Sequence, residues 1–247
     1  MTGLPRTVDA VPLSFRLLHR FERYLAHASL LGDPPVHDPR LFAWVPALEA
    51  AVPDMVAEYR RLVDGGEPIP PFHEISPEQL PITSDDRWRT FVLHAYGIEA
   101  PRNAALCPRT AAAVRAVPGM QTAMFSILEP GKRLAPHRGP YKGLLRVQVA
   151  LELPTEREAC WIEVDGIRMH WQHGRTIVFD DTRVHSAANE SAQRRCVLFM
   201  DILRPMHPFA DGLNRTLLWL LRRSPFGRRA QRVFADWYRR HGIVADA

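Results

Sequence analysis

The chain has 247 residues, enough for one sizeable domain and too few for a multidomain assembly. Hydrophobic residues make up 46% of it and charged residues 24%, which excludes an intrinsically disordered protein. The longest apolar run near either end, Leu217 to Leu221, is far shorter than a membrane span, and the first residues lack the basic and apolar regions of a signal peptide. We therefore expect a cytoplasmic protein.

The net charge of +5 is concentrated in one part of the chain. Between Arg204 and His241 nine arginines stand against two acids, giving +7, so the remainder carries −2. A pI near 9.5 therefore does not indicate a nucleic-acid partner. The three cysteines, Cys107, Cys160 and Cys196, are far apart and show no metal-binding spacing, which argues against a disulfide framework or a structural zinc site.

In chain order, the sequence predicts three segments of one folded unit. Residues 1–82 contain two helices, at about 13–25 and 45–62, followed by a proline-rich linker over 68–81. Residues 83–205 hold short strands separated by turns, which favours a β-sandwich or barrel. Among them, Asp165-Gly166 is a two-residue hairpin signal. Residues 206–247 form basic helices interrupted at Pro225.

The clearest predicted strand, 144–153, has two different faces. Arg146, Gln148 and Ala150 share one face, while the other is wholly aliphatic. We expect the aliphatic face to pack on the terminal helices and the first to point inward, and Arg195 repeats the pattern on the last strand. An inward arginine is costly unless it meets an anion. The partner is either a small dicarboxylate or phosphate ligand, or internal acids such as Glu152, Glu163 or Asp201.

Two of the eleven histidines precede these inward arginines. His137 lies nine residues ahead of Arg146, and His185 lies ten residues ahead of Arg195. Two imidazoles at the mouth of a barrel suit a metal that also binds an anionic chelating cosubstrate, and imidazole favours iron, copper, nickel or zinc. The alternative is that both histidines are surface or core residues.

Several motifs in this order resemble the aspartyl/asparaginyl β-hydroxylase family over about residues 88–205. They are Ser126-Ile-Leu-Glu-Pro-Gly131, Pro136-His-Arg-Gly-Pro140, Leu145-Arg146, Cys160-Trp-Ile, Phe179-Asp-Asp181, His185 and Arg195 through Asp201 to Pro205. The resemblance implies an Fe(II)- and 2-oxoglutarate-dependent oxygenase that uses O₂. It also implies a mainly β fold, a jelly-roll or cupin-like double-stranded β-helix with helices at both ends. A bacterial branch of the family hydroxylates the acyl chains of lipid A.

The resemblance also assigns roles around the metal. It makes His137 and His185 the iron ligands. The carboxylate of the usual oxygenase triad is absent, because Gly139 stands at its position, as in some members of the family. Asp181 is either a group that orients a metal-bound water from outside the ligand set or an ordinary turn residue.

Four further residues are assigned to the cosubstrate by resemblance. Arg195 pairs with the distal carboxylate of 2-oxoglutarate, and Ser126 adds a hydroxyl donor. Arg146 holds the other carboxylate, beside the keto group. Gln148 stands where the family often has histidine, and its amide N–H₂ can still donate.

Three functions remain open from the sequence. The first is hydroxylation of an aspartyl or asparaginyl side chain in a peptide, a free amino acid or a carrier-bound residue. The second is the same chemistry on a lipid acyl chain, with peripheral contact at the inner membrane through the basic tail and its aromatic residues, unless these pack on the sheet: Trp219, Phe226, Phe234 and Trp237. The third is a non-catalytic or zinc-bound cupin-like module, which Gly139 and Gln148 would allow. The prime substrate is not specified by any motif.

Overall fold

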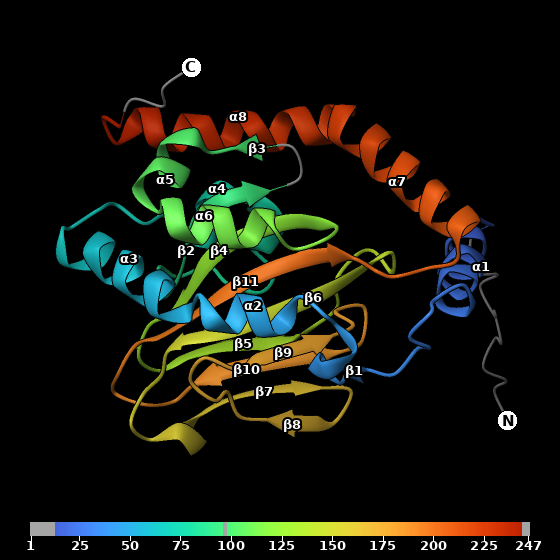
Figure 1. Ribbon diagram of the computed structural model, residues 1–247. Coiled ribbons are helices and arrows are strands. Elements are labelled where there is room, and N and C mark those ends of the chain that lie inside the picture. The colour runs from blue at the N-terminus through green and yellow to red at the C-terminus, as the bar shows by residue number, and fades with distance from the viewer. Residues whose placement is uncertain (1–12, 96–97, 244–247) are drawn as a thin grey trace, which may run out of the picture.

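Two antiparallel sheets form the body of the protein, seen in a computed structural model that describes residues 13–95 and 98–243 (Figure 1). The larger sheet has seven strands in the order β1 (Val36–His37), β9 (Thr176–Phe179), β6 (Leu144–Glu152), β11 (Arg195–Leu203), β4 (Met120–Leu128), β2 (Trp88–Ala95) and β3 (Ile98–Glu99). The smaller has four, in the order β5 (Lys132–His137), β10 (His185–Asn189), β7 (Cys160–Val164) and β8 (Ile167–Met169). The predicted double-stranded β-helix is confirmed.

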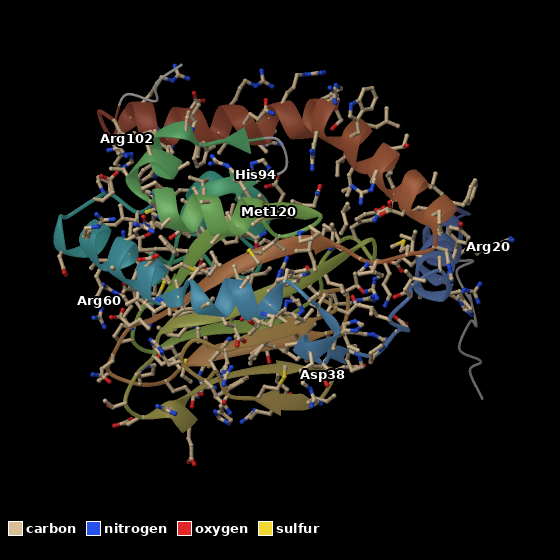
Figure 2. All side chains as sticks on the ribbon, in the orientation of Figure 1. Arg20, Asp38, Arg60, His94, Arg102 and Met120 are labelled. Carbon is tan, nitrogen blue, oxygen red and sulfur yellow. The ribbon has the colours of Figure 1, made fainter. Side chains whose placement is uncertain are left out.

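Helices cover the larger sheet and both ends of the body. They are α1 (Leu13–His27), α2 (Val45–Ala50), α3 (Val52–Asp64), α4 (Phe72–Ile75), α5 (Pro101–Leu106), α6 (Pro108–Arg115), α7 (Pro208–Arg223) and α8 (Pro225–Arg240). Short 3₁₀ turns lie at Pro39–Leu41, Pro77–Gln79 and Arg157–Ala159. Charged side chains of the covering helices, such as Arg20 of α1 and Arg60 of α3, point away from the sheets (Figure 2). Side chains of residues 13–19, 96–99 and 226 lie outside those described, as do the N-terminal residues 1–12 and the last four.

The two faces of β6 have the predicted environments. Leu145, Val147 and Val149 belong to a buried cluster that includes residues of α2 and α3, such as Leu48 and Met55. Ala150 belongs instead to the cluster between the two sheets. Since alternate residues of a strand face opposite ways, Arg146 and Gln148 share that inner side with Ala150.

Several local expectations need correction. The single helix expected over 45–62 is two helices, because Pro53 has no N–H to donate and crowds the preceding turn. The linker over 68–81 contains α4 and a 3₁₀ turn. Strand β1 was not expected and extends the larger sheet by pairing with β9. The hairpin at Asp165-Gly166 is confirmed, with φ values of 50° and 80° that suit a type I′ turn.

Three aromatic residues of α8 pack on the body. Phe234, Trp237 and Tyr238 are buried in the cluster between the sheets and the terminal helix. The Trp237 indole donates to Glu74 Oε2 at 2.6 Å. Trp219 on α7, by contrast, is 50% exposed. Within the part of the chain that the structure describes, no helix combines the length and apolar character needed to cross a bilayer.

Candidate active site between the two sheets

The smaller sheet brings the two singled-out histidines together. His137 ends β5 and His185 begins β10, and the two residues are direct partners in the antiparallel ladder. Their ring centroids lie 4.1 Å apart. Residues separated by 48 positions in the sequence thus present adjacent imidazoles at one end of the β-structure.

Hydrogen bonds fix how each imidazole is presented. His137 Nδ1 lies 2.7 Å from the Ala135 carbonyl oxygen, and His185 Nδ1 lies 2.9 Å from that of Arg183. A carbonyl oxygen only accepts, so Nδ1 carries the proton and Nε2 keeps the lone pair that a metal requires. Burial lowers the pKa of His137, and burial together with His137 and Arg146 lowers the pKa of His185 to about 3. Both rings are therefore neutral at physiological pH, the form that binds metals.

Arg195 is a buried cation for which the described part of the chain supplies no carboxylate. Its side chain on β11 is 2% exposed, and its guanidinium lies over the Trp171 ring at 4.5 Å. Nη1 donates to the Ser126 carbonyl oxygen at 3.2 Å, but Nε is buried with no hydrogen-bond partner. Among the described residues no carboxylate forms an ion pair with it, and burial lowers its pKa. A guanidinium held in this way fits an anionic ligand.

Hydroxyl and amide groups adjoin Arg195 on the same face of the sheet. Ser126 Oγ accepts a hydrogen bond from the Trp88 indole at 3.0 Å, which leaves its own O–H to donate. Gln148 Oε1 accepts from the Trp171 indole at 3.1 Å, which leaves the amide N–H₂ to donate. Thr90 pairs with Ser126 in the ladder, and its buried Oγ1 has no partner. Thr90 and Trp171 were not singled out from the sequence, although Thr90 follows the alternation that starts at Trp88.

Arg146 has a different environment from Arg195. Its Nη2 lies 2.8 Å from Asp181 Oδ2, and its Nε donates to Asp201 Oδ1 at 3.0 Å. Its guanidinium also lies 4.2 Å from the centre of the Phe199 ring. Of the two alternatives left open for the inward arginines, internal acids therefore apply to Arg146. The carboxylate-binding role that the resemblance implies for Arg146 is not needed to neutralise its charge.

Asp181 occupies the space next to the missing triad position. Its side chain is buried, and its carbonyl oxygen accepts from the Gly139 N–H at 2.6 Å. A Cβ at residue 139 would overlap the Asp181 carboxylate. Asp181 is thus a buried residue in contact with Gly139 and Arg146, unlike an ordinary exposed turn residue. Burial raises its pKa to about 6, against the opposing effect of Arg146.

A three-residue cluster elsewhere also has metal-binding geometry. His73, Glu74 and Asp86 have ligand atoms within 4.8 Å of one another, and no other such group is found among the described residues. Two of the three side chains are exposed, and Glu74 already accepts from Trp237. In the described residues the ligand atoms of His137, His185 and Asp181 do not lie this close to one another.

A cavity of about 430 Å³, lined mostly by charged residues, adjoins the loops that carry the histidines. It lies between α1, the loop after His137 and the turn before His185, and its lining carries both charges: Glu22, Arg23, Ala26, Asp33, Arg138, Lys142, Thr182 and Arg183. Lys142 is anchored beneath it by Asp33 at 2.6 Å and by Asp180 at 2.5 Å. The cavity therefore has a mixed-charge lining that includes residues next to both histidines in the sequence, Arg138 and Arg183.

Comparison with known proteins identifies the family. Residues 49–205 match the model described as aspartyl/asparaginyl beta-hydroxylase. The chain belongs to the aspartyl/asparaginyl β-hydroxylase family. Its resemblance to this family, inferred from the motifs, is thereby confirmed, and the chain is a member of a hydroxylase family.

Within the family, similarity extends to proteins that are named for different functions. The chain is 38% identical over 217 residues to the ornithine lipid ester-linked acyl 2-hydroxylase of Rhizobium tropici, covering 88% of this chain and 77% of that protein. It is 32% identical over 135 residues to human aspartate beta-hydroxylase domain-containing protein 2, covering 50% of this chain but only 35% of that protein. Among solved structures, a Pseudomonas putida prolyl-4-hydroxylase is 16% identical, covering 63% of this chain and 87% of that one, with a TM-score of 0.42.

Proposed function

We propose that this member of the aspartyl/asparaginyl β-hydroxylase family is an Fe(II)- and 2-oxoglutarate-dependent hydroxylase of a membrane-lipid acyl chain. The observation that carries the cosubstrate assignment is Arg195, a buried guanidinium with no carboxylate partner among the described residues. A dicarboxylate such as 2-oxoglutarate would supply the missing charge. The assignment of the protein as a hydroxylase rests on the match to the family.

The residues present fit an iron ion. His137 and His185 would hold it through Nε2, because their Nδ1 atoms donate to backbone carbonyls. When bound, iron supplies the chemistry by which O₂ oxidises an unactivated C–H bond to an alcohol as 2-oxoglutarate becomes succinate and CO₂. Asp181 is held by Arg146, so we assign it to positioning the ligands rather than to the ligand set.

The cosubstrate would lie along the inner face of the larger sheet. Arg195 would bind its distal carboxylate, since its guanidinium Nε is buried without a hydrogen-bond partner. Ser126 and Thr90 would add hydroxyl hydrogen bonds, and Gln148 would donate through its amide. Trp171 would hold both Arg195 and Gln148 in place, since it contacts each of them.

A lipid substrate is favoured over an aspartyl or asparaginyl side chain by two observations. The relative named as an acyl 2-hydroxylase matches most of this chain and most of its own length, whereas the human aspartate hydroxylase-domain protein is covered only to about a third. In addition, the cavity beside the histidine loops has basic and acidic side chains, among them Arg23 and Glu22, which suits a head group that carries both charges.

Mass spectrometry of lipids tests this proposal. Purified protein is incubated with Fe(II), 2-oxoglutarate and ornithine lipid, and a peptide containing aspartate and asparagine is offered in parallel. We expect one added oxygen atom on the lipid acyl chain, dependent on both cofactors, and none on the peptide. Oxidation of the peptide alone would assign the aspartyl/asparaginyl function instead. Oxidation of neither, with no succinate formed, would favour the non-catalytic module.

A further inference from the structure

Helix α7 carries apolar side chains that leave much of their surface exposed. Besides Trp219 and Leu221 they include Phe209, Leu213, Leu217 and Leu220, and Phe209 is the most exposed at 79%. Their spacing of four, four and three residues places them on one side of the helix. We call these four residues the α7 stripe. Contiguous exposed apolar side chains of this kind mark an interaction surface more often than a bare exterior.

The opposite side of α7 already holds the helix on the body. Leu218 packs with Leu144 and Leu203 in a small buried cluster. Asn214 accepts from the Tyr141 hydroxyl at 2.6 Å and donates to the Gly143 carbonyl oxygen at 2.8 Å. The α7 stripe is therefore not needed to attach the helix. The same contacts connect α7 to the loop that follows His137.

Charge distinguishes the possible occupants of this surface. Between residues 208 and 240 eight arginines stand against two acids, so α7 and α8 together carry +6. On α7, Arg223 lies over the exposed Trp219 ring at 4.1 Å, beside the stripe. Helix α8 buries Phe234, Trp237 and Tyr238 and exposes its arginines, including Arg228, Arg229 and Arg232. A second copy of the chain would bring two such basic surfaces together, whereas an anionic bilayer attracts them.

We propose that the α7 stripe inserts into the head-group boundary of an anionic lipid bilayer, with Arg223 of α7 and the exposed arginines of α8 facing the lipid phosphates. An exposed apolar side flanked by arginine is the arrangement found in interfacial helices. Figure 1 shows α7 projecting from the edge of the sheets beyond β11, with α8 continuing across the top of the body. The inference rests on the proposed function, because membrane binding would serve to deliver lipid to the site. The binding itself requires neither metal nor cosubstrate.

Vesicle sedimentation tests the proposal with two matched double variants. Phe209→Asp with Leu220→Asp removes two side chains of the α7 stripe. Leu41→Asp with Leu80→Asp removes two leucines elsewhere that are 58% and 52% exposed, comparable to the 53% of Leu220. Both variants change the net charge by the same amount, so a difference between them isolates the apolar contact. Circular dichroism checks that both remain folded.

We expect the wild type and the Leu41/Leu80 variant to sediment with vesicles of equal parts phosphatidylglycerol and phosphatidylcholine. The Phe209/Leu220 variant should partition at least about tenfold more weakly, because two exposed side chains no longer leave water. Vesicles of phosphatidylcholine alone should bind the wild type more weakly. Equal partitioning of the two variants, or no binding of the wild type to anionic vesicles, would overturn the proposal.

Two further measurements distinguish membrane binding from self-association and from catalysis. The wild type could instead fail to bind vesicles and form a dimer in light scattering, while the Phe209/Leu220 variant stays monomeric. In that case the α7 stripe is a self-association surface and the proposal is wrong. Hydroxylation of detergent-dispersed lipid is measured separately. Absence of that activity in the wild type with vesicle binding intact would reject the proposed function alone, whereas activity without vesicle binding would reject only the docking surface.

Discussion

Replacing each of the two inward arginines by methionine should have different effects on stability. Arg146 and Arg195 lie on neighbouring strands and share the inner face of the larger sheet. Arg146 forms ion pairs with Asp181 and Asp201, whereas Arg195 has no carboxylate partner among the described residues. Methionine has a similar length and no charge, so the same substitution probes two different electrostatic environments.

The expected changes in the free energy of unfolding follow from these contacts. Arg146→Met leaves two buried carboxylates without their cation, a change that costs about 3–5 kcal/mol of the free energy of unfolding. For a chain of this size that lowers Tm by about 6 to 20 °C. Arg195→Met removes a buried charge that has no carboxylate partner among the described residues, together with its hydrogen bond to Ser126 O. The unfolding free energy of the ligand-free protein should therefore stay within about 1 kcal/mol of wild type.

Thermal unfolding with and without 2-oxoglutarate and Fe(II) under anaerobic conditions measures both effects. The Arg195→Met protein should lose the stabilisation by 2-oxoglutarate, since a bound carboxylate left unpaired weakens affinity at least about a hundredfold. A loss of several kcal/mol in ligand-free Arg195→Met would show that Arg195 is structural. Undiminished stabilisation of that variant by 2-oxoglutarate would refute its assignment to the cosubstrate.

Three further predictions concern the histidines and Gly139. His137→Ala and His185→Ala should each abolish Fe(II) binding measured by calorimetry, and retention of wild-type affinity in either would remove that residue from the ligand set. Burial lowers the pKa of His37, on β1, from 6.5 to about 4. As the pH falls, the unfolded chain therefore takes up a proton at a higher pH than the folded protein does. This difference contributes about 3 kcal/mol to the free energy of unfolding. The contribution is fully present above pH 6.5 and is lost as the pH falls toward 4. Urea unfolding of His37→Gln should show a flatter pH dependence, and an unchanged slope would contradict this. Gly139→Ala should lower the unfolding free energy by about 1–3 kcal/mol, because its Cβ overlaps the Asp181 carboxylate; a neutral result in thermal unfolding would mean that Asp181 is free to move.

The alternation of side chains along a strand was sufficient to predict which residues are buried where that depends on the strand alone. The aliphatic side of β6 predicted its burial under helices, and the alternation predicted that Arg146 and Gln148 face inward. The Asp165-Gly166 turn was equally local, because it depends on the backbone angles of its own residues. The spacing left a shared metal site for His137 and His185 as one of two alternatives, and the family resemblance then assigned it, since their pairing depends on the ladder between β5 and β10.

Features that depend on register across strands could not be read from the sequence. Arg146 and Arg195 show the same alternation, but only Arg146 lies opposite Asp201 in the ladder. The unpartnered Thr90 hydroxyl likewise has meaning only beside Ser126. Strand β5 is short and contains Pro136, a residue depleted in strands, so its pattern does not predict a strand.

The packing of the two C-terminal helices could not be predicted from the sequence either. Both α7 and α8 are amphipathic and rich in arginine, so their sequences alone do not tell the tail aromatics apart. The structure separates them, since Phe234 and Trp237 of α8 are buried while Phe209 and Trp219 of α7 are exposed. Which amphipathic face meets the body depends on tertiary contacts such as the Trp237–Glu74 hydrogen bond, which no local pattern encodes.

Succinate formation is the most direct test of a ferrous, 2-oxoglutarate-consuming site centred on His137 and His185. Purified protein receives Fe(II), 2-oxoglutarate and ornithine lipid in air, with His185→Ala and zinc-loaded wild type as matched controls. Succinate should appear in equal amount to oxidised lipid with the wild type and be absent from both controls. Succinate production by His185→Ala at the wild-type rate, or none from the iron-loaded wild type, would contradict this account of the site.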